Sequence, residues 1–287
     1  MNGILLVDKP EGWTSSDVVC KLKGVFHQKK IGHSGTLDPM ATGLLPVFFG
    51  KATKAIEFAE NHRKVYLASL KLGIVTDTQD IWGRVLSENP SDVSTGDFMS
   101  VCRSFIGEID QIPPMYSAVK IGGKKLYELA RKGKEVERPV RRITIESLEV
   151  EYTDGTEYRI RIECSKGTYI RTLCHDIGER LGTGACMTAL RRIACGPFDI
   201  SDAIPLNDIL AEPESVSSRL IPTDELFSAF PRYTASETDI RRIKCGVPFS
   251  AEVEDGIYRV YSSQNDFLML GSAENNVMHS RKNFFEV

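Results

Sequence analysis

The chain has 287 residues, of which 41% are hydrophobic and 26% charged, and its formal net charge is −3 at pH 7. These values exclude a chain too short or too polar to bury a core, and they leave room for one large domain with a small second one. They give no global sign of a nucleic-acid partner, which a strongly basic balance usually indicates.

The N-terminal run GILLV (residues 3–7) is only five residues long and is followed at once by Asp8 and Lys9, so it is neither a signal peptide nor a membrane span. We therefore expect a cytoplasmic protein that does not engage a membrane. The seven cysteines form no Cys-x-x-Cys pair and are odd in number, which favours free, mostly buried thiols over a disulfide framework.

The predicted elements begin with a strand over residues 4–7 and a turn over residues 12–16. Thr14, Ser15 or Ser16 can cap a helix that follows this turn. The apolar face of this helix is formed by Val18, Leu22, Val25 and Phe26. The chain therefore opens as strand, turn and helix.

Residues 32–43 (GHSGTLDPMATG) contain three glycines and one proline but no periodicity, so they predict an ordered loop, here set between two predicted helices. A loop so rich in special residues is usually a site. Its one carboxylate is Asp38. An aspartate before a proline more often only forms a turn, so these residues alone leave a purely structural Asp38 open.

Further along the chain, residues 64–72 alternate weakly and predict a strand. Apolar residues within 98–106 lie on one side of a helix that should end at Gly107. Two alternating runs, residues 145–152 and 158–164, flank a tight Asp-Gly turn and predict a hairpin.

Residues 120–142 carry nine basic side chains against three acidic ones, a local charge of +6. This segment is a candidate for contact with phosphates. A merely solvated face is the alternative, and charge alone does not decide between the two. The basic residues are Lys120, Lys124, Lys125, Arg131, Lys132, Lys134, Arg138, Arg141 and Arg142.

Residues 201–222 are acidic, contain proline and predict a connector. Short strand patterns follow at residues 258–261, 267–270 and 284–287, which predict a small C-terminal β domain. Because helices and strands are mixed without strict alternation, the predicted fold class is α+β.

No motif for a cofactor or a metal is complete. Residues 43–53 (GLLPVFFGKAT) resemble a phosphate-binding P-loop, but the two glycines are seven apart instead of five and Ala52 follows Lys51 where Ser or Thr is required. Neither G-x-G-x-x-G nor H-E-x-x-H occurs, and the five histidines are scattered. We therefore expect no nucleotide cofactor and no metal.

Five segments together resemble the TruB family of pseudouridine synthases, in the same order and at similar spacing over roughly the first 195 residues. They are residues 3–19 (GILLVDKPEGWTSSDVV), 32–46 (GHSGTLDPMATGLLP), 64–73 (KVYLASLKLG), 111–120 (QIPPMYSAVK) and 166–178 (KGTYIRTLCHDIG).

The resemblance implies a catalytic domain over residues 1–222 with a mixed, mainly antiparallel sheet. A mobile RNA-binding thumb loop is implied over about residues 114–142, where the basic segment lies. Residues 223–287 are implied to be a small C-terminal PUA-like RNA-binding domain.

The resemblance also implies a site. Asp38 in GTLDP matches the family's catalytic aspartate, the expected nucleophile. We expect Arg171 to pair with Asp38 and to fix the direction of its carboxylate. The substrate-binding positions carried over are His33, which contacts RNA around the flipped uridine, Tyr66, which stacks on the target base, and Tyr169, Arg171 and Leu190, which line the same pocket.

For each of these positions a plainer interpretation stays open. Tyr66 and Leu190 are compatible with simple core packing. Tyr169 and Arg171 are compatible with a helix start that carries a surface ion pair. Lys9 in VDKP either supports the Asp38 loop or has a direct role, and the sequence does not decide.

The expected activity is isomerisation of uridine 55 in the T-loop of tRNA to pseudouridine, without a cofactor, by a monomer that needs no protein partner. One rival is a non-catalytic RNA-binding module, which the intact GTLDP and GTYIR segments count against. The other is a guide-RNA-directed, dyskerin-like synthase, which the short, non-basic tails disfavour.

Overall fold

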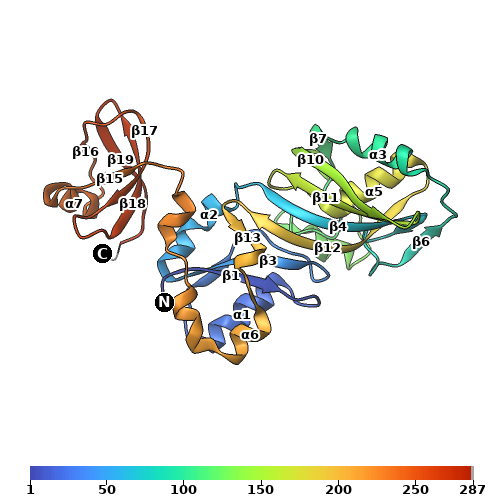
Figure 1. Cartoon of the computed structure of the whole chain (residues 1–287), viewed down its shortest axis with the longest axis horizontal. Helices are drawn as coiled ribbons and strands as arrows, with labels where there is room; N and C mark the ends of the chain where they lie inside the picture. Colours follow the sequence, from blue (N-terminus) through green and yellow to red (C-terminus); the bar gives the residue numbers. More distant parts are fainter. Residues whose placement is uncertain (286–287) are drawn as a thin grey trace.

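In the computed structural model, which describes residues 1–285, the chain folds into two large sheets with helices packed against them, and two small two-stranded sheets (Figure 1). The larger sheet has ten strands. In spatial order its main path is β14 (Ile204–Pro205), β1 (Gly3–Lys9), β3 (Thr42–Phe49), β12 (Ala185–Cys195), β4 (Lys64–Leu72), β11 (Glu157–Cys164), β10 (Arg141–Thr153) and β7 (Gly107–Gln111).

Two short strands complete this sheet, β2 (Ile31–His33) beside β3 and β13 (Phe198–Asp199) beside β12. Among the described pairings of this large sheet, β1 with β14 and β3 with β12 are parallel and the others are antiparallel. The prediction of a mixed, mainly antiparallel sheet in an α+β fold is confirmed.

Three helices cover one face of the large sheet. α1 (Ser15–Val25) begins after Thr14, whose hydroxyl accepts the Asp17 amide at 3.0 Å while the Asp17 carboxylate accepts the Thr14 amide, and this capping box fixes the start of the helix. α5 (Ile170–Leu181) packs on β12, and α3 (Thr95–Arg103) packs on α5 and β10.

The main hydrophobic core lies between these helices and the sheet. β4 alternates strictly between buried and half-buried residues, so every second side chain enters the core. These side chains are Tyr66, Ala68, Leu70 and Leu72. They meet apolar residues of the helices, among them Val18, Leu22, Leu173 and Ile177.

The smaller sheet has five strands, with its own core and one helix, α7 (Glu237–Lys244). Phe227 joins it to the larger part, because its ring lies 5.4 Å from that of Phe58 and 5.9 Å from that of Phe284. The strands are β15 (Arg232–Thr234), β17 (Gly256–Tyr261), β18 (Phe267–Glu274), β19 (Val277–Asn283) and β16 (Phe249–Ser250).

The remaining elements are short. Two small ribbons pair β5 (Ile74–Thr76) with β6 (Val85–Glu88) and β8 (Lys120–Ile121) with β9 (Lys124–Lys125). The other helical turns are η1 (Gly50–Ala55), α2 (Ile56–Ala59), α4 (Leu126–Ala130), η2 (Ile200–Asp202), α6 (Leu206–Ala211), η3 (Pro213–Arg219) and η4 (Thr223–Phe227).

The strands predicted over residues 4–7 and 64–72 and the hairpin of β10 and β11 are confirmed. The prediction that residues 32–43 lie between two helices was wrong, because β2 precedes the loop and β3 follows it. A strand of three residues is too short to show alternation.

Two other predicted boundaries were also wrong. α3 ends at Arg103, and Ile106 is exposed. The last described strand is β19, which ends at Asn283; of the strand predicted over residues 284–287, the last two residues lie outside the described part of the chain. An exposed apolar residue after a helix mimics the helical pattern, so its end is poorly marked in the sequence.

Candidate active site

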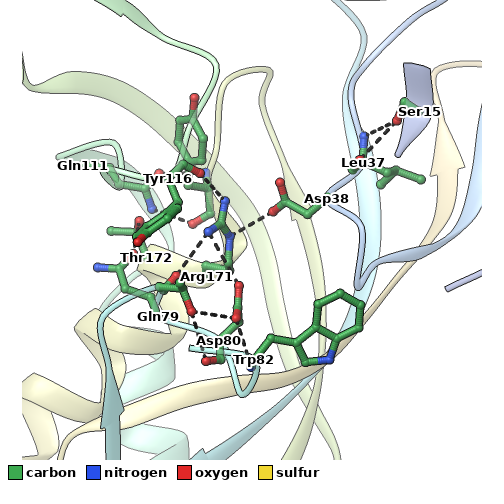
Figure 2. A network of polar contacts seen from close by, with 12 residues as sticks. Ser15, Leu37, Asp38, Gln79, Asp80, Trp82, Gln111, Tyr116, Arg171 and Thr172 are labelled. Atoms are coloured by element: carbon green, nitrogen blue, oxygen red, sulfur yellow. Dashed lines mark hydrogen bonds and ion pairs between the residues drawn. The ribbon is translucent and has the colours of Figure 1, made fainter. Parts of the chain in front are cut away.

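Asp38 lies on the loop that joins β2 to β3, and Ser15 at the start of α1 is hydrogen-bonded to this loop. Ser15 binds the residue before Asp38 twice: the Leu37 amide donates to Ser15 Oγ at 2.8 Å, and Ser15 Oγ approaches the Leu37 carbonyl at 3.1 Å (Figure 2). On the other side, the Pro39 carbonyl accepts the Gly12 amide at 2.8 Å. The backbone of Asp38 is therefore fixed on both sides while its side chain stays 37% exposed.

Arg171 in the first turn of α5 meets the Asp38 carboxylate. Its Nε lies 2.9 Å from Asp38 Oδ2, so the predicted pairing of these two residues is confirmed. The Arg171 side chain is 5% exposed, and its guanidinium also donates to the Thr78 carbonyl at 3.1 Å and to the Tyr116 carbonyl at 2.8 Å. One buried cation thus joins the Asp38 loop, α5 and two other loops (Figure 2).

Asp80 is a second carboxylate on this cation, and sequence reasoning missed it. Its Oδ2 lies 3.6 Å from Arg171 Nη1, while its Oδ1 accepts the Thr78 hydroxyl at 2.7 Å and the Trp82 amide at 3.1 Å. Burial raises the pKa of Asp80, and the Thr78 hydroxyl and Arg171 oppose this. The only local signal was the run TDTQD (residues 76–80), whose side chains favour turns.

Tyr169 is placed by its backbone. It is the residue before the first turn of α5, and its amide donates to Gln111 Oε1 at 2.8 Å while Gln111 Nε2 donates to its carbonyl at 3.1 Å. The side chain of Gln111 therefore fixes the start of the helix that carries Arg171 (Figure 2).

Tyr66 and Leu190 lie on neighbouring strands, β4 and β12, and both belong to the main core cluster together with Leu37. Each is only 8% exposed, so most of its side chain packs in the core. Burial raises the pKa of Tyr66 to about 12. Core packing thus covers most of the side-chain surface of both residues, and only a small part of that surface can contact a ligand.

His33 ends β2, next to the Asp38 loop. Burial lowers its pKa, and the positive charge of Arg192 lowers it further. Its Nδ1 is buried and has no hydrogen-bond partner among residues 1–285. The structure therefore places a histidine favoured in its neutral form beside the loop.

Two buried cationic side chains, Lys9 and Arg192, lie next to the Asp38 loop. Lys9 is fully buried, and its Nζ donates to the carbonyls of Pro10 (2.9 Å), Trp13 (2.7 Å) and, more weakly, Pro39 (3.4 Å). Burial lowers the pKa of Lys9 to about 8, and the nearby Asp38 charge opposes this. These carbonyl contacts favour the supporting role over the direct one.

Arg192 is also fully buried, and its Nε donates to the Leu44 carbonyl at 2.7 Å, whereas its two Nη atoms find no partner in the described chain. A Cβ at Gly35 would lie 2.9 Å from Arg192 Nη1, and Gly35 has a φ of +68°, so glycine is needed here. No sequence signal marked this arginine as buried.

Across residues 1–285, no helix is long and apolar enough to cross a membrane. Nor do three or more His, Cys, Asp or Glu side chains gather as a metal site requires, within that same range. The arrangement instead offers one partly exposed carboxylate held by a buried guanidinium, which suits nucleophilic or general-base chemistry.

The domain families matched by the chain define its class. Residues 23–170 match "TruB family pseudouridylate synthase (N terminal domain)", and residues 171–228 match "tRNA pseudouridylate synthase B C-terminal domain". These are pseudouridine synthase domains. The chain belongs to the TruB family.

Curated relatives agree with this over nearly the whole length. A tRNA pseudouridine synthase B of Clostridium tetani is 45% identical over 278 residues, which are 94% of this chain and 95% of the relative. One of Clostridium perfringens is 44% identical over 283 residues, 96% of each chain.

Solved structures share the fold. The crystal structure of a Cbf5-Nop10-Gar1 complex contains a chain that is 26% identical, with a TM-score of 0.76, 99% of this chain and 85% of that one being covered. A chain in an H/ACA RNP bound to a substrate RNA containing 2'-deoxyuridine gives a TM-score of 0.75 at 24% identity, with the same coverage.

Proposed function

We propose that this chain isomerises uridine 55 in the T-loop of tRNA to pseudouridine, with Asp38 as the attacking carboxylate and no cofactor. Membership of the TruB family and relatives named tRNA pseudouridine synthase B support this activity. The observation that carries the role of Asp38 is its geometry: its side chain is 37% exposed, and its Oδ2 lies 2.9 Å from Nε of Arg171, whose side chain is 5% exposed.

The reaction breaks the bond between C1′ and N1 of the uridine and joins C1′ to C5 of the same base. An Asp38 oxygen attacks C1′ and releases the base, as a retaining glycosidase nucleophile does. The base turns, C5 attacks C1′ and the carboxylate leaves. C5 then loses its proton and N1 gains one, so nothing is oxidised or reduced and no atom is added.

A uridine within a folded loop must be flipped out to reach Asp38. We propose that His33, Tyr66, Tyr169 and Leu190 surround the flipped base, with Tyr66 stacked on its ring. Arg171 would hold Asp38 in the attacking direction through the Nε contact, since a charge-assisted hydrogen bond fixes geometry as well as charge.

We also propose the division into a catalytic domain of residues 1–222 and a PUA-like RNA-binding domain of residues 223–287. The separate core of the smaller sheet supports this division. We further propose that the chain acts in the cytoplasm as a monomer and without a guide RNA. The name tRNA pseudouridine synthase B of its bacterial relatives supports tRNA as the substrate.

The proposal predicts tritium release from a tRNA transcript labelled at uridine C5. The wild-type protein should release label, whereas Asp38→Ala, or a transcript with uridine 55 changed to cytidine, should release none. A non-catalytic RNA-binding module would release no label from any transcript. A guided synthase would release label only after a guide RNA is added.

The thumb loop, residues 114–142, should contact RNA phosphates. Lys124, Lys132 and Lys134 are exposed there, and reversing all three charges should weaken tRNA binding. The slope of log K against log salt should become shallower by about 0.9 for each duplex phosphate that the variant no longer neutralises.

The matched control reverses three lysines in and just after α1, Lys21, Lys23 and Lys29, which gives the same change of net charge. It should leave the salt slope nearly unchanged. Equal slopes for the two triple variants would remove the thumb from the RNA interface.

A further inference from the structure

Trp82 is unusually exposed for a tryptophan. It leaves 55% of its surface to solvent, whereas the other tryptophan, Trp13, packs partly into the main core. Large apolar residues continue along the same segment, with Ile81 41%, Val85 51% and Leu86 56% exposed. Four exposed large apolar side chains within six residues make this segment a candidate interaction surface.

This exposure is built into an ordered segment. The Ile81 amide donates to the Met187 carbonyl at 2.9 Å, which fastens the segment to β12, and the Gly83 amide donates to the Asp80 carbonyl at 3.1 Å. The Trp82 amide itself donates to Asp80 Oδ1 at 3.1 Å. The backbone below the indole is therefore fixed on both sides.

The same contacts connect Trp82 to the active site. Asp80 Oδ2 lies 3.6 Å from the guanidinium of Arg171, whose Nε holds Asp38. In the view of Figure 2 the indole extends past Asp80 and lies below Asp38, on the same side of Arg171. Arg84, two residues further, has an 80% exposed side chain, whose Nε lies 4.0 Å from Asp77 Oδ2.

We propose that Trp82 is a substrate-positioning residue that stacks on an unpaired RNA base next to the flipped uridine. This rests on the proposed function. Flipping removes the stacking partner of a neighbouring base, and an exposed indole beside the site replaces that partner. An aromatic ring followed by a cation is the combination that binds single-stranded RNA, because the ring takes a base and the cation a phosphate.

The first test uses fluorescence. Trp13→Phe leaves Trp82 as the only tryptophan, and titration with an unmodified T-arm stem-loop should quench its emission. Trp82→Phe leaves only Trp13, whose emission should change little. Emission of Trp82 that RNA does not alter would overturn the proposal.

The second test is a double-mutant cycle between protein and RNA. Trp82→Ala should raise the RNA Kd by roughly 5- to 150-fold, the range for one stacked base. Trp82→Phe should restore most of the affinity, but Trp82→Leu should not. Ile106→Ala truncates a large apolar side chain without a ring that is 45% exposed between α3 and β7, outside this segment; it is the matched control and should leave Kd unchanged.

The RNA partner is located by removing one base at a time from the nucleotides that flank the target uridine. At one position, removing the base should clearly weaken RNA binding to the wild type. The same removal should weaken RNA binding to Trp82→Ala only slightly. Additive losses at every position would refute stacking. Tritium release by the wild type, measured in parallel, separates this failure from a failure of the proposed function, which would give no release at all.

Discussion

Asp38→Asn is expected to lower the rate of uridine isomerisation by at least about 10³-fold, because an amide oxygen is a poor nucleophile for C1′. Affinity for tRNA should change little, since most of the binding free energy of such complexes comes from phosphate contacts. The fold should persist, because Ser15, Gly12 and Lys9 hold the loop through its backbone and not through the Asp38 side chain.

Single-turnover tritium release measures the rate, and filter binding measures the affinity. Asp110→Asn is the matched control, because Asp110 is an exposed aspartate on β7, outside the site, whose side chain is 62% exposed. It should turn over at the wild-type rate. Turnover by Asp38→Asn within tenfold of the wild type would remove Asp38 from the chemistry.

Much of the fold was predictable because its central strands have a clear period. β4 alternates buried and half-buried residues along its whole length, and β10 and β11 flank an Asp-Gly turn. β3 was missed because all but its first residue are buried, so its sequence shows a continuous apolar run without alternation. Such a run does not distinguish a strand from a helix.

The site was predictable only where a motif carried it. Asp38 and Arg171 lie far apart in the sequence, and their pairing was expected from the family resemblance. Asp80 was missed because its role arises only when β12 and α5 bring residues 76–84 against the guanidinium. The exposure of Trp82 and the burial of Arg192 likewise depend on tertiary packing. Residue type alone would predict a buried tryptophan and an exposed arginine.

Arg171→Leu is expected to abolish activity and to lower the free energy of unfolding by about 3 to 5 kcal/mol, the usual cost of removing one partner of a buried ion pair. Asp80 is the reason, because its side chain is only 11% exposed and would lose its cation. Arg171→Lys should be nearly as inactive, since one ammonium cannot reach Asp38, Asp80 and the two carbonyls of Thr78 and Tyr116 together.

The cause of the instability can be tested with the double variant Arg171→Leu/Asp80→Asn, which also removes the unpaired negative charge of Asp80. If the unpaired carboxylate causes the loss, the double variant should be more stable than Arg171→Leu, and urea unfolding measures this difference.

The pH dependence of stability gives an independent check. Burial already raises the pKa of folded Asp80, and loss of Arg171 raises it further, so folded Arg171→Leu binds a proton more readily than its unfolded chain. The free energy of unfolding of Arg171→Leu should therefore approach that of the wild type as pH falls toward the ordinary aspartate pKa of about 3.9. A difference in unfolding free energy that does not depend on pH would refute this account.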